Sequence, residues 1–388
     1  MERQEPEGRA ICRRPRGEEA LRGAKFVGYL LLGALIGVLL AGRPLSADLA
    51  RAVLVGFVLI VPLALLALFL AIVVHELGHV AGGRLAGMEF RFVQFGPLSI
   101  HRQDGRCQMK WIPRSFAGGL AFMVPARHRL VEQYRSFILG GPLASLAWCA
   151  ICLALYIWAH REPSPAWAPL TTLLFGISLV VLPGTLWPHV VNGYPTDALF
   201  LLKLRTPGPE RDRILALFEV HREGASGKRA RDWSTDLLET ALIPQDGSQF
   251  ELRARYLAYW HCLDRGEWER ARDEIERAVS LVKHRDRRAG VVGQAVLLEK
   301  AYLLAFFDHD ADAAAALIRE LKEPGTFVEG IKLRAESAIA WARADADSAR
   351  DLATKAEMVV EDHARRTGTS IAAESDLLRA LMDEPAAV

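Results

Sequence analysis

The chain has 388 residues, of which 51% are hydrophobic, and its 48 basic and 46 acidic side chains leave a formal net charge of only +2. This charge gives no support for nucleic-acid binding, and the length allows more than one domain. The five cysteines are scattered and odd in number, which argues against a disulfide framework. Apolar residues concentrate in the first half, whereas Arg, Asp, Glu and Ala enrich the second. We therefore expect a membrane domain followed by a soluble domain.

Four apolar segments are close to the roughly 20 residues that a helix needs to cross a bilayer. They cover Phe26–Gly42, Ala52 to Val74 with the polar motif that follows, Ser136–Ala159, and Pro165 to beyond Trp187. They predict a polytopic helical domain over residues 25–204, in contact with lipid. Cys149 and Cys152 form a CxxC within the third segment, but no strand pattern surrounds them, so we interpret them as small buried side chains.

Basic residues predict the orientation of these segments. Residues 1–24 form a basic tail without the cleavage pattern of a signal peptide, and they are placed in the cytoplasm together with the Lys- and Arg-rich stretch between Arg84 and Arg135. The short loops near residues 43–51 and 161–162 are then outside, and everything after Leu204 is inside. We expect a multi-pass protein of a bacterial cytoplasmic membrane with both termini in the cytoplasm.

Residues 88–123 are not helical in pattern. Stretches 90–95, 98–102 and 107–111 alternate as strands do, and Asp104-Gly105 is a turn signal. A small β-hairpin at the membrane surface is predicted. It could be a plain cover, or its edge could hold an extended substrate by strand addition, and the sequence favours neither.

The region 205–388 is helical in pattern throughout. One stretch resembles the second helix of a tetratricopeptide repeat, which has Gly, an aromatic residue, Ala, a large apolar residue and Ala at fixed positions; here these are Gly266, Trp268, Ala271, Ile275 and Ala278. Similar runs recur at Asp310–Leu321 and Asp345–Ala356. The match is partial, because Tyr259 stands at the usual Gly and Lys283 at the closing Pro. We expect a cytoplasmic α-helical, tetratricopeptide-like domain that binds the substrate or a protein regulator, with a plain helical domain as the alternative.

The motif His75-Glu76-Leu77-Gly78-His79 ends the second apolar segment. On a helix, HExxH places two imidazoles on one face, where both can bind one zinc ion, and the Glu can act as a base. Two His and one Glu next to the hydrocarbon of a membrane cost free energy unless they pair with each other or bind an ion. We therefore favour a metal site over the alternative, in which the polar end of the helix only reaches water.

A catalytic zinc ion needs a third protein ligand and an open position. Asp197 is the best candidate, because it is the only acid between Glu162 and Glu210 and an isolated acid in apolar surroundings is expensive to leave unpaired. His189 is the rival ligand, and Asp197 could instead be the N-cap of a helix over 198–204.

HELGH at the end of an apolar helix, the run Gly140–Ser145 in the next one, and a late Asp after Pro and Gly resemble the site-2 protease family of intramembrane zinc metalloproteases, over about residues 52–204. The resemblance implies that His75, His79 and Asp197 bind zinc and that Glu76 is the catalytic acid/base. The chain departs from the family where Ala198 replaces the usual Gly after Asp, where Ser145 replaces a common Asn, and where the Asn-x-x-Pro lead-in is absent.

These observations predict an intramembrane zinc endopeptidase that hydrolyses a peptide bond of a membrane-anchored protein near the cytoplasmic face, as in regulated intramembrane proteolysis. Gly141, Pro142, Pro183 and Gly184 could loosen nearby helices and admit water, but ordinary helix packing is the favoured interpretation of them. The alternative function is a non-catalytic membrane scaffold with a structural or vestigial zinc site and a protein-binding helical domain.

Overall fold

The computed structural model forms two compact units, residues 1–65 and 66–388. In the first unit only the start of helix α2 (Ala47–Leu85) is described, so the predicted tail 1–24 and the first apolar segment lie outside the described residues. The described residues are 47–103, 106–111, 118–126, 129–161, 167–191, 194–282, 290–321 and 328–382.

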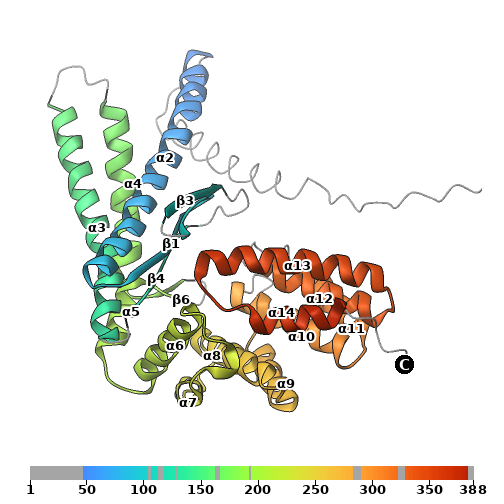
Figure 1. Ribbon diagram of the computed structural model, residues 1–388. Coiled ribbons are helices and arrows are strands. Elements are labelled where there is room, and N and C mark those ends of the chain that lie inside the picture. The colour runs from blue at the N-terminus through green and yellow to red at the C-terminus, as the bar shows by residue number, and fades with distance from the viewer. Residues whose placement is uncertain are drawn as a thin grey trace, which may run out of the picture. The chain divides into compact units, whose positions relative to one another are not determined.

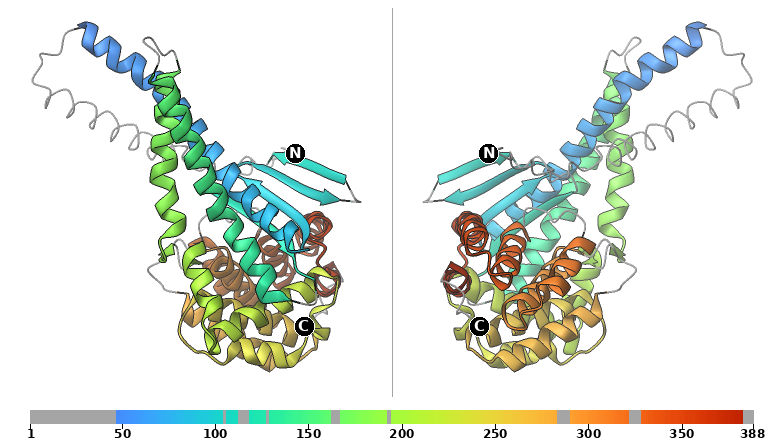
Figure 2. Two further views of the ribbon diagram at one scale, coloured as in Figure 1. Left: turned by 90° about the vertical axis from the view of Figure 1, so that its left-hand side faces the viewer. Right: turned by 90° about the vertical axis from the view of Figure 1, so that its right-hand side faces the viewer.

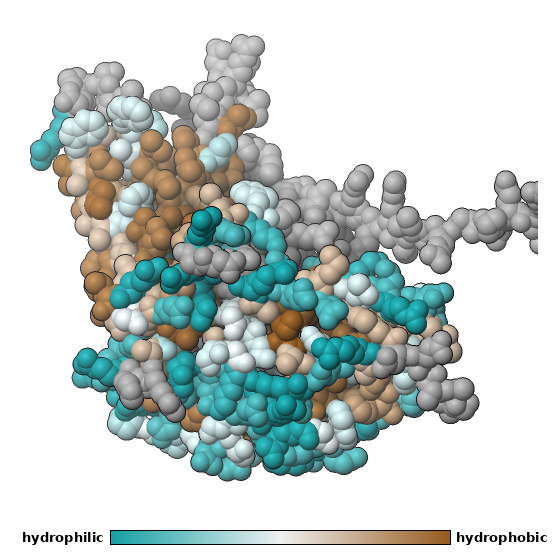
Figure 3. Space-filling view, in the orientation of Figure 1, coloured by the Kyte–Doolittle hydropathy of each residue, from teal (hydrophilic) through white to brown (hydrophobic). Residues whose placement is uncertain are grey.

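Three helices of the described part are long and apolar enough to cross a membrane. They are the Ile60–Leu85 part of α2, α3 (Leu130–Ala159) and α4 (Ala168–Leu186), which confirms three of the predicted segments. Helices α3 and α4 run side by side as a hairpin (Figure 1), and apolar side chains cover the face that they present in Figure 3. Cys149 and Cys152 are buried free thiols within α3, as predicted.

Helices α2 and α3 touch through their backbones. A Cβ atom on Gly78 would lie 2.4 Å from the Gly140 carbonyl oxygen, and one on Gly82 would lie 2.2 Å from that of Ser136. The Ser136 hydroxyl also donates to the Gly82 carbonyl over 2.8 Å. Small residues four apart let membrane helices approach this closely. The contact fixes the part of α2 that carries HELGH against α3.

A small antiparallel sheet follows α2, as the alternating pattern predicted. Its order is β3-β2-β1-β4, so β4 is an edge strand that joins the predicted hairpin. Val93 and Phe95 of β1 pack into a core with Ile138 of α3, which seats the sheet on the helices. The strands are β1 (Glu89–Phe95), β2 (Leu98–Gln103), β3 (Arg106–Trp111) and β4 (Gly119–Val124).

After α4 the chain forms a two-stranded ribbon and then a succession of helices. Consecutive helices pack as hairpins, α8 on α9, α10 on α11 and α12 on α13 (Figures 1 and 2). The elements are β5 (Val190–Val191), β6 (Tyr194–Pro195), α5 (Asp197–Arg205), α6 (Pro209–Ala225), the 3-10 turn η1 (Ala230–Asp232), α7 (Thr235–Leu242), α8 (Gln249–Asp264), α9 (Trp268–Leu281), α10 (Val291–Phe306), α11 (Ala311–Glu320), α12 (Glu329–Ala342), α13 (Ala346–Thr367) and α14 (Ala372–Met382).

The helical hairpins share one apolar core. Ala271, Ile275 and Ala278 of α9 are fully buried in it, and Gly266 adopts φ +74° in the turn before that helix. These are positions that the repeat pattern singled out. The membership of α8–α14 in the tetratricopeptide class stays a prediction.

Candidate metal centre

Helix α2 carries the three polar residues of HELGH to its contact with α3. His79 and Glu76 are each only 7% exposed, and the His75 side chain is 13% exposed. Because His75 and His79 are four residues apart, their rings lie on one helix face, with 3.1 Å between the two Nε2 atoms. Two buried imidazoles therefore direct the same nitrogen at one point.

Asp197 reaches that point from a different part of the chain. Its Oδ2 lies 3.2 Å from His75 Nε2 and 3.6 Å from His79 Nε2. The ribbon β5–β6 delivers it there: Thr196 bonds back to Trp187 and His189, and α5 then begins at Asp197. The N-terminus of a helix favours a carboxylate, because its free amides and dipole are positive.

The alternative interpretation of Asp197 as an N-cap is wrong. Thr196 occupies the N-cap position of α5, with extended backbone, and Asp197 is the first helical residue. The rival ligand is not part of the group either: the His189 ring contacts the Trp187 carbonyl over 2.8 Å, and its nitrogens are not among the ligand atoms that converge. Among the described residues, the group that could hold a metal ion here is His75, His79 and Asp197, whose ligand atoms lie within 4.8 Å of one another.

The other ring nitrogen of each histidine has a partner on α3. His79 Nδ1 lies 2.8 Å from the Phe137 carbonyl oxygen, and His75 Nδ1 lies 2.9 Å from the Ser145 hydroxyl. A carbonyl can only accept, so His79 carries its proton on Nδ1 and presents a lone pair at Nε2. Partners of this kind orient metal-binding imidazoles and set their tautomer.

Two glycines leave the room that the site needs. A Cβ atom on Gly141 would lie 2.4 Å from His79 Nε2 and 2.8 Å from His75 Cε1. A Cβ atom on Gly119, the first residue of β4, would lie 2.3 Å from Glu76 Oε1. Gly141 thus lies against the imidazoles, and Gly119 brings the edge strand against the carboxylate.

The donor set fits a zinc ion. Two imidazole nitrogens and one carboxylate oxygen are the ligands that catalytic zinc sites use, and three protein ligands leave a position for water or substrate. The carboxylate would offset part of the ion's charge, and the Nδ1 contacts free both Nε2 atoms for binding. His75, His79 and Asp197 are therefore the residues that could hold the metal.

Sequence reasoning missed three contributors to this site. The Phe137 carbonyl carries no side-chain signal, and Gly119 is found only through the sheet register that sets β4 beside Glu76. Ser145 was noted only as a departure from the family pattern, although its hydroxyl holds His75. Its position in the run Gly140–Ser145, one helix away from HELGH, was the available signal.

Comparison with known proteins agrees with this geometry. No curated protein and no solved structure matches the chain. The family model of Peptidase family M50 matches residues 63–361, which is most of the chain and includes His75, Glu76, His79 and Asp197. This finding confirms the resemblance to site-2 proteases at the level of the family. The chain belongs to peptidase family M50, a family of zinc-dependent integral membrane metalloproteases.

Proposed function

We propose that the protein is an intramembrane zinc endopeptidase that hydrolyses a peptide bond of a membrane-anchored protein near the cytoplasmic face. The observation that carries the proposal is the convergence of His75 Nε2, His79 Nε2 and Asp197 Oδ2 at the end of a membrane-spanning segment. Membership of family M50 supports the same activity.

In this proposal His75, His79 and Asp197 hold the zinc ion. When bound, zinc acts as a Lewis acid that polarises the scissile carbonyl and makes the attacking water more acidic. Ser145 and the Phe137 carbonyl keep the two rings in the orientation that binding requires. Gly141 leaves the approach to the two rings clear.

Glu76 is the residue that moves the proton. Its carboxylate takes a proton from the attacking water and delivers it to the leaving amide nitrogen, which must be protonated to depart as an amine. The carboxylate is buried beside Gly119, so it is screened from bulk water while it does so.

Strand β4 is the element best placed to hold the substrate. A peptide in helical form hides its carbonyls in hydrogen bonds, so the scissile segment must be extended. As an edge strand that begins against Glu76, β4 can pair with such a segment through its backbone. Of the two roles that the sequence left open for the hairpin, this proposal takes strand addition and locates it next to the proton-transfer group.

The membrane orientation stays part of the proposal. The basic residues of the stretch between Arg84 and Arg135 place the site near the cytoplasmic face. Residues 25–204 then form the protease domain in the bilayer, and residues 205–388 form a cytoplasmic domain that binds the substrate or a protein regulator.

The test is the Glu76→Gln variant of the full chain, co-expressed with a membrane-anchored substrate. We expect zinc content like that of the wild type and a rate of cleavage lower by about 100-fold or more, because a positioned acid/base contributes about that much. Unchanged cleavage in this variant would contradict the role of Glu76.

Metal analysis of the wild type separates this function from a non-catalytic scaffold. A catalytic site has zinc with three protein ligands and an open position, whereas a scaffold has no zinc or a closed shell of four ligands. Absence of zinc, together with absence of cleavage, would favour the scaffold.

A further inference from the structure

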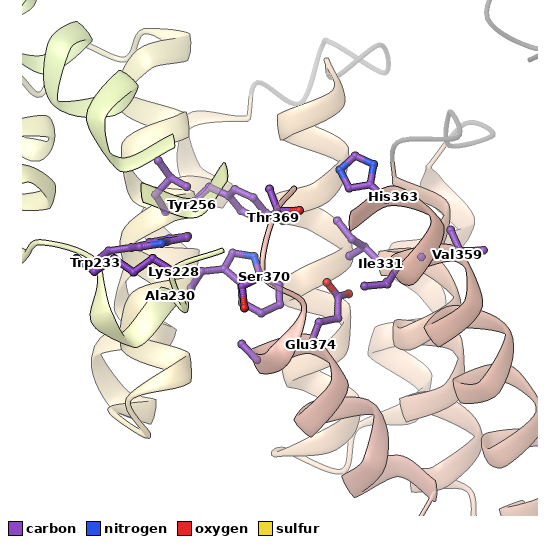
Figure 4. A pocket seen from close by; sticks show the side chains of 16 residues that line it. Lys228, Ala230, Trp233, Tyr256, Ile331, Val359, His363, Thr369, Ser370 and Glu374 are labelled. Carbon is purple, nitrogen blue, oxygen red and sulfur yellow. The ribbon is translucent and has the colours of Figure 1, made fainter. Parts of the chain in front are cut away.

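The helices of the C-terminal region line a half-open cavity of about 310 Å³. Trp233, which follows η1, and Tyr256 and Trp260 of α8 give it aromatic walls, and Ile331 of α12 and Val359 of α13 give it an apolar wall. Figure 4 shows Trp233 and Val359 on opposite sides, with Glu374 of α14 between them. The Arg334 guanidinium already lies over the Trp260 ring, 4.9 Å from its centroid, which leaves Trp233 and Tyr256 as the aromatic walls for a further cation. An acid beside such rings is suited to a cation, because ring faces and a carboxylate both attract positive charge.

The carboxylate of Glu374 belongs to a cluster in which one guanidinium lies beside two carboxyl groups. The Arg334 guanidinium is fully buried, and it donates to Glu374 over 3.2 Å and also to the buried Glu299. One guanidinium thus faces two carboxylates. Burial raises the pKa of Glu299, and the nearby Glu374 carboxylate adds to this rise. A cation in the cavity would give Glu374 a second positive partner besides Arg334.

Two further basic residues line the cavity, Lys228 and His363, and both already interact with other groups. Lys228 also lines the cavity, but its ammonium is 2.8 Å from a carboxylate oxygen of Glu223 and is neutralised there. Trp233 Nε1 is buried without a hydrogen-bond partner in the structure. A buried N–H normally has an acceptor, and the carbonyl of a bound peptide would provide one.

The cavity is connected to the metal centre through the sheet. Thr369 and Ser370 line it, and the preceding Gly368 lies against the Arg91 guanidinium of β1, where a Cβ atom would be 3.0 Å from Nη1. Strand β1 pairs with β4, which begins against Glu76. A chain segment that occupies the cavity would therefore lie beside residues that contact the sheet whose strand β4 begins against Glu76.

We infer that this cavity binds an arginine or lysine side chain in the cytoplasmic juxtamembrane segment of the substrate. Membrane proteins carry an excess of Lys and Arg just inside the membrane, so a substrate cut near the cytoplasmic face presents such residues close to the scissile bond. The identity of the partner rests on the proposed proteolysis, whereas the binding of a basic side chain does not.

The experiment measures peptide binding to the purified full chain in an uncharged detergent. The chain carries the Glu76→Gln substitution so that no peptide is cut. The probes are two short fluorescent peptides of equal length, one of alternating Arg and Ala and one of alternating Gln and Ala, followed by fluorescence anisotropy. We expect the Arg peptide to bind at least about tenfold more tightly, the scale of one cation–π contact together with an ion pair. Equal affinity for the two peptides, or no binding of either, overturns the inference.

Variants connect this binding to the cavity. Adding Glu374→Gln should weaken binding of the Arg peptide about tenfold, while the control Asp376→Asn, an acid on the same helix that does not line the cavity, should leave it unchanged. Should Glu374→Gln fail to fold, Val359→Trp fills the cavity instead, and its control is Met358→Trp at a 66% exposed position. Full affinity in the folded Glu374→Gln or Val359→Trp protein overturns the inference.

Cleavage is measured separately, on a membrane substrate whose juxtamembrane basic residues are replaced by Gln. The wild-type protein should cut this altered substrate several-fold more slowly than the original substrate. The Glu374→Gln variant should cut both substrates at the same rate. A wild type that cuts neither substrate contradicts the proposed protease, and the peptide binding still decides the role of the cavity.

Discussion

His79 and His221 lie in two different regions of the molecule. Their Nδ1 atoms have the same kind of partner, but the surroundings of their Nε2 atoms differ. His79 is on the membrane helix α2, and His221 is on α6 of the helical region. In each, Nδ1 lies against a backbone carbonyl, 2.8 Å from Phe137 O and 2.6 Å from Leu217 O. Both rings therefore carry a proton on Nδ1 and a lone pair on Nε2.

The difference is what Nε2 faces. His221 Nε2 accepts from the Arg253 guanidinium, 3.1 Å from its Nε, whereas His79 Nε2 faces a second imidazole and the Asp197 carboxylate. A lone pair that accepts a hydrogen bond is not available to bind a metal ion. Lone pairs that converge with a carboxylate are available for this. The environment of the second nitrogen, not burial, distinguishes a candidate ligand from a structural histidine.

Removal of the carboxylate breaks this comparison most strongly. In Asp197→Ala the two imidazoles keep their α3 partners but lose the third ligand. We expect zinc affinity to fall by more than about 100-fold, beyond the cost of losing an outer partner, and cleavage to disappear. Zinc per chain is measured by elemental analysis, and His189→Ala, outside the group, is the control that keeps its zinc. Zinc retained in Asp197→Ala and lost in His189→Ala would reverse the assignment.

The site could be predicted from sequence to the extent that its residues are close in the chain. His75, Glu76 and His79 lie within five residues, and Asp197 was found because it is a lone acid in apolar surroundings. The Phe137 carbonyl and Gly119 could not be found, because their roles depend on where α3 crosses α2 and on the register of β4.

The fold shows the same division. Apolar length predicted α3 and α4, and alternation predicted β1, β2 and β3, because each is a local property. Strand β4 has no clear alternation, so only its pairing with β1 reveals it. The cluster of Arg334, Glu299 and Glu374 joins three helices, and no local pattern connects residues so far apart.

A methyl group at position 141 tests whether the two rings need the space that Gly141 leaves. The Cβ atom of Gly141→Ala would lie 2.4 Å from His79 Nε2, so the ring must move out of the binding geometry. We expect zinc affinity to fall by roughly 10- to 100-fold, with little change in thermal stability. Gly184→Ala on α4 is the matched control, because a Cβ atom there has no neighbour within 4 Å. Equal zinc affinity in both variants would show that the rings do not depend on this contact.

Loss of the Ser145 hydroxyl tests the outer contact of His75. Ser145→Ala removes the partner 2.9 Å from Nδ1 and leaves the ring free to turn or to change tautomer. We expect zinc affinity to fall about tenfold, and Ser145→Thr, which keeps a hydroxyl, to restore most of it. Titration with a competing chelator measures both. If Ser145→Thr is as weak as Ser145→Ala, the shape of the side chain matters and its hydrogen bond does not.

The pH dependence of stability tests the other member of the comparison. Burial, and then the charge of Arg253, lowers the pKa of His221 to about 3. The folded chain thus binds fewer protons here than the unfolded chain, whose histidine titrates near 6.5. The stabilisation is present above about pH 6.5 and is lost as the pH falls toward about 3, by up to about 1.4 kcal/mol per pH unit.

Urea unfolding of the full chain in detergent at about pH 6.5 and about pH 5.5 measures this loss. His221→Gln keeps an acceptor for Arg253 but cannot titrate, so the variant should lose about 1 kcal/mol less than the wild type over this interval. A chelator that removes zinc should leave that difference unchanged, because Arg253 already fills the Nε2 position of His221. Identical slopes for the two proteins would mean that the pKa of His221 is the same in the folded and the unfolded chain, and the contrast with His79 would then not hold.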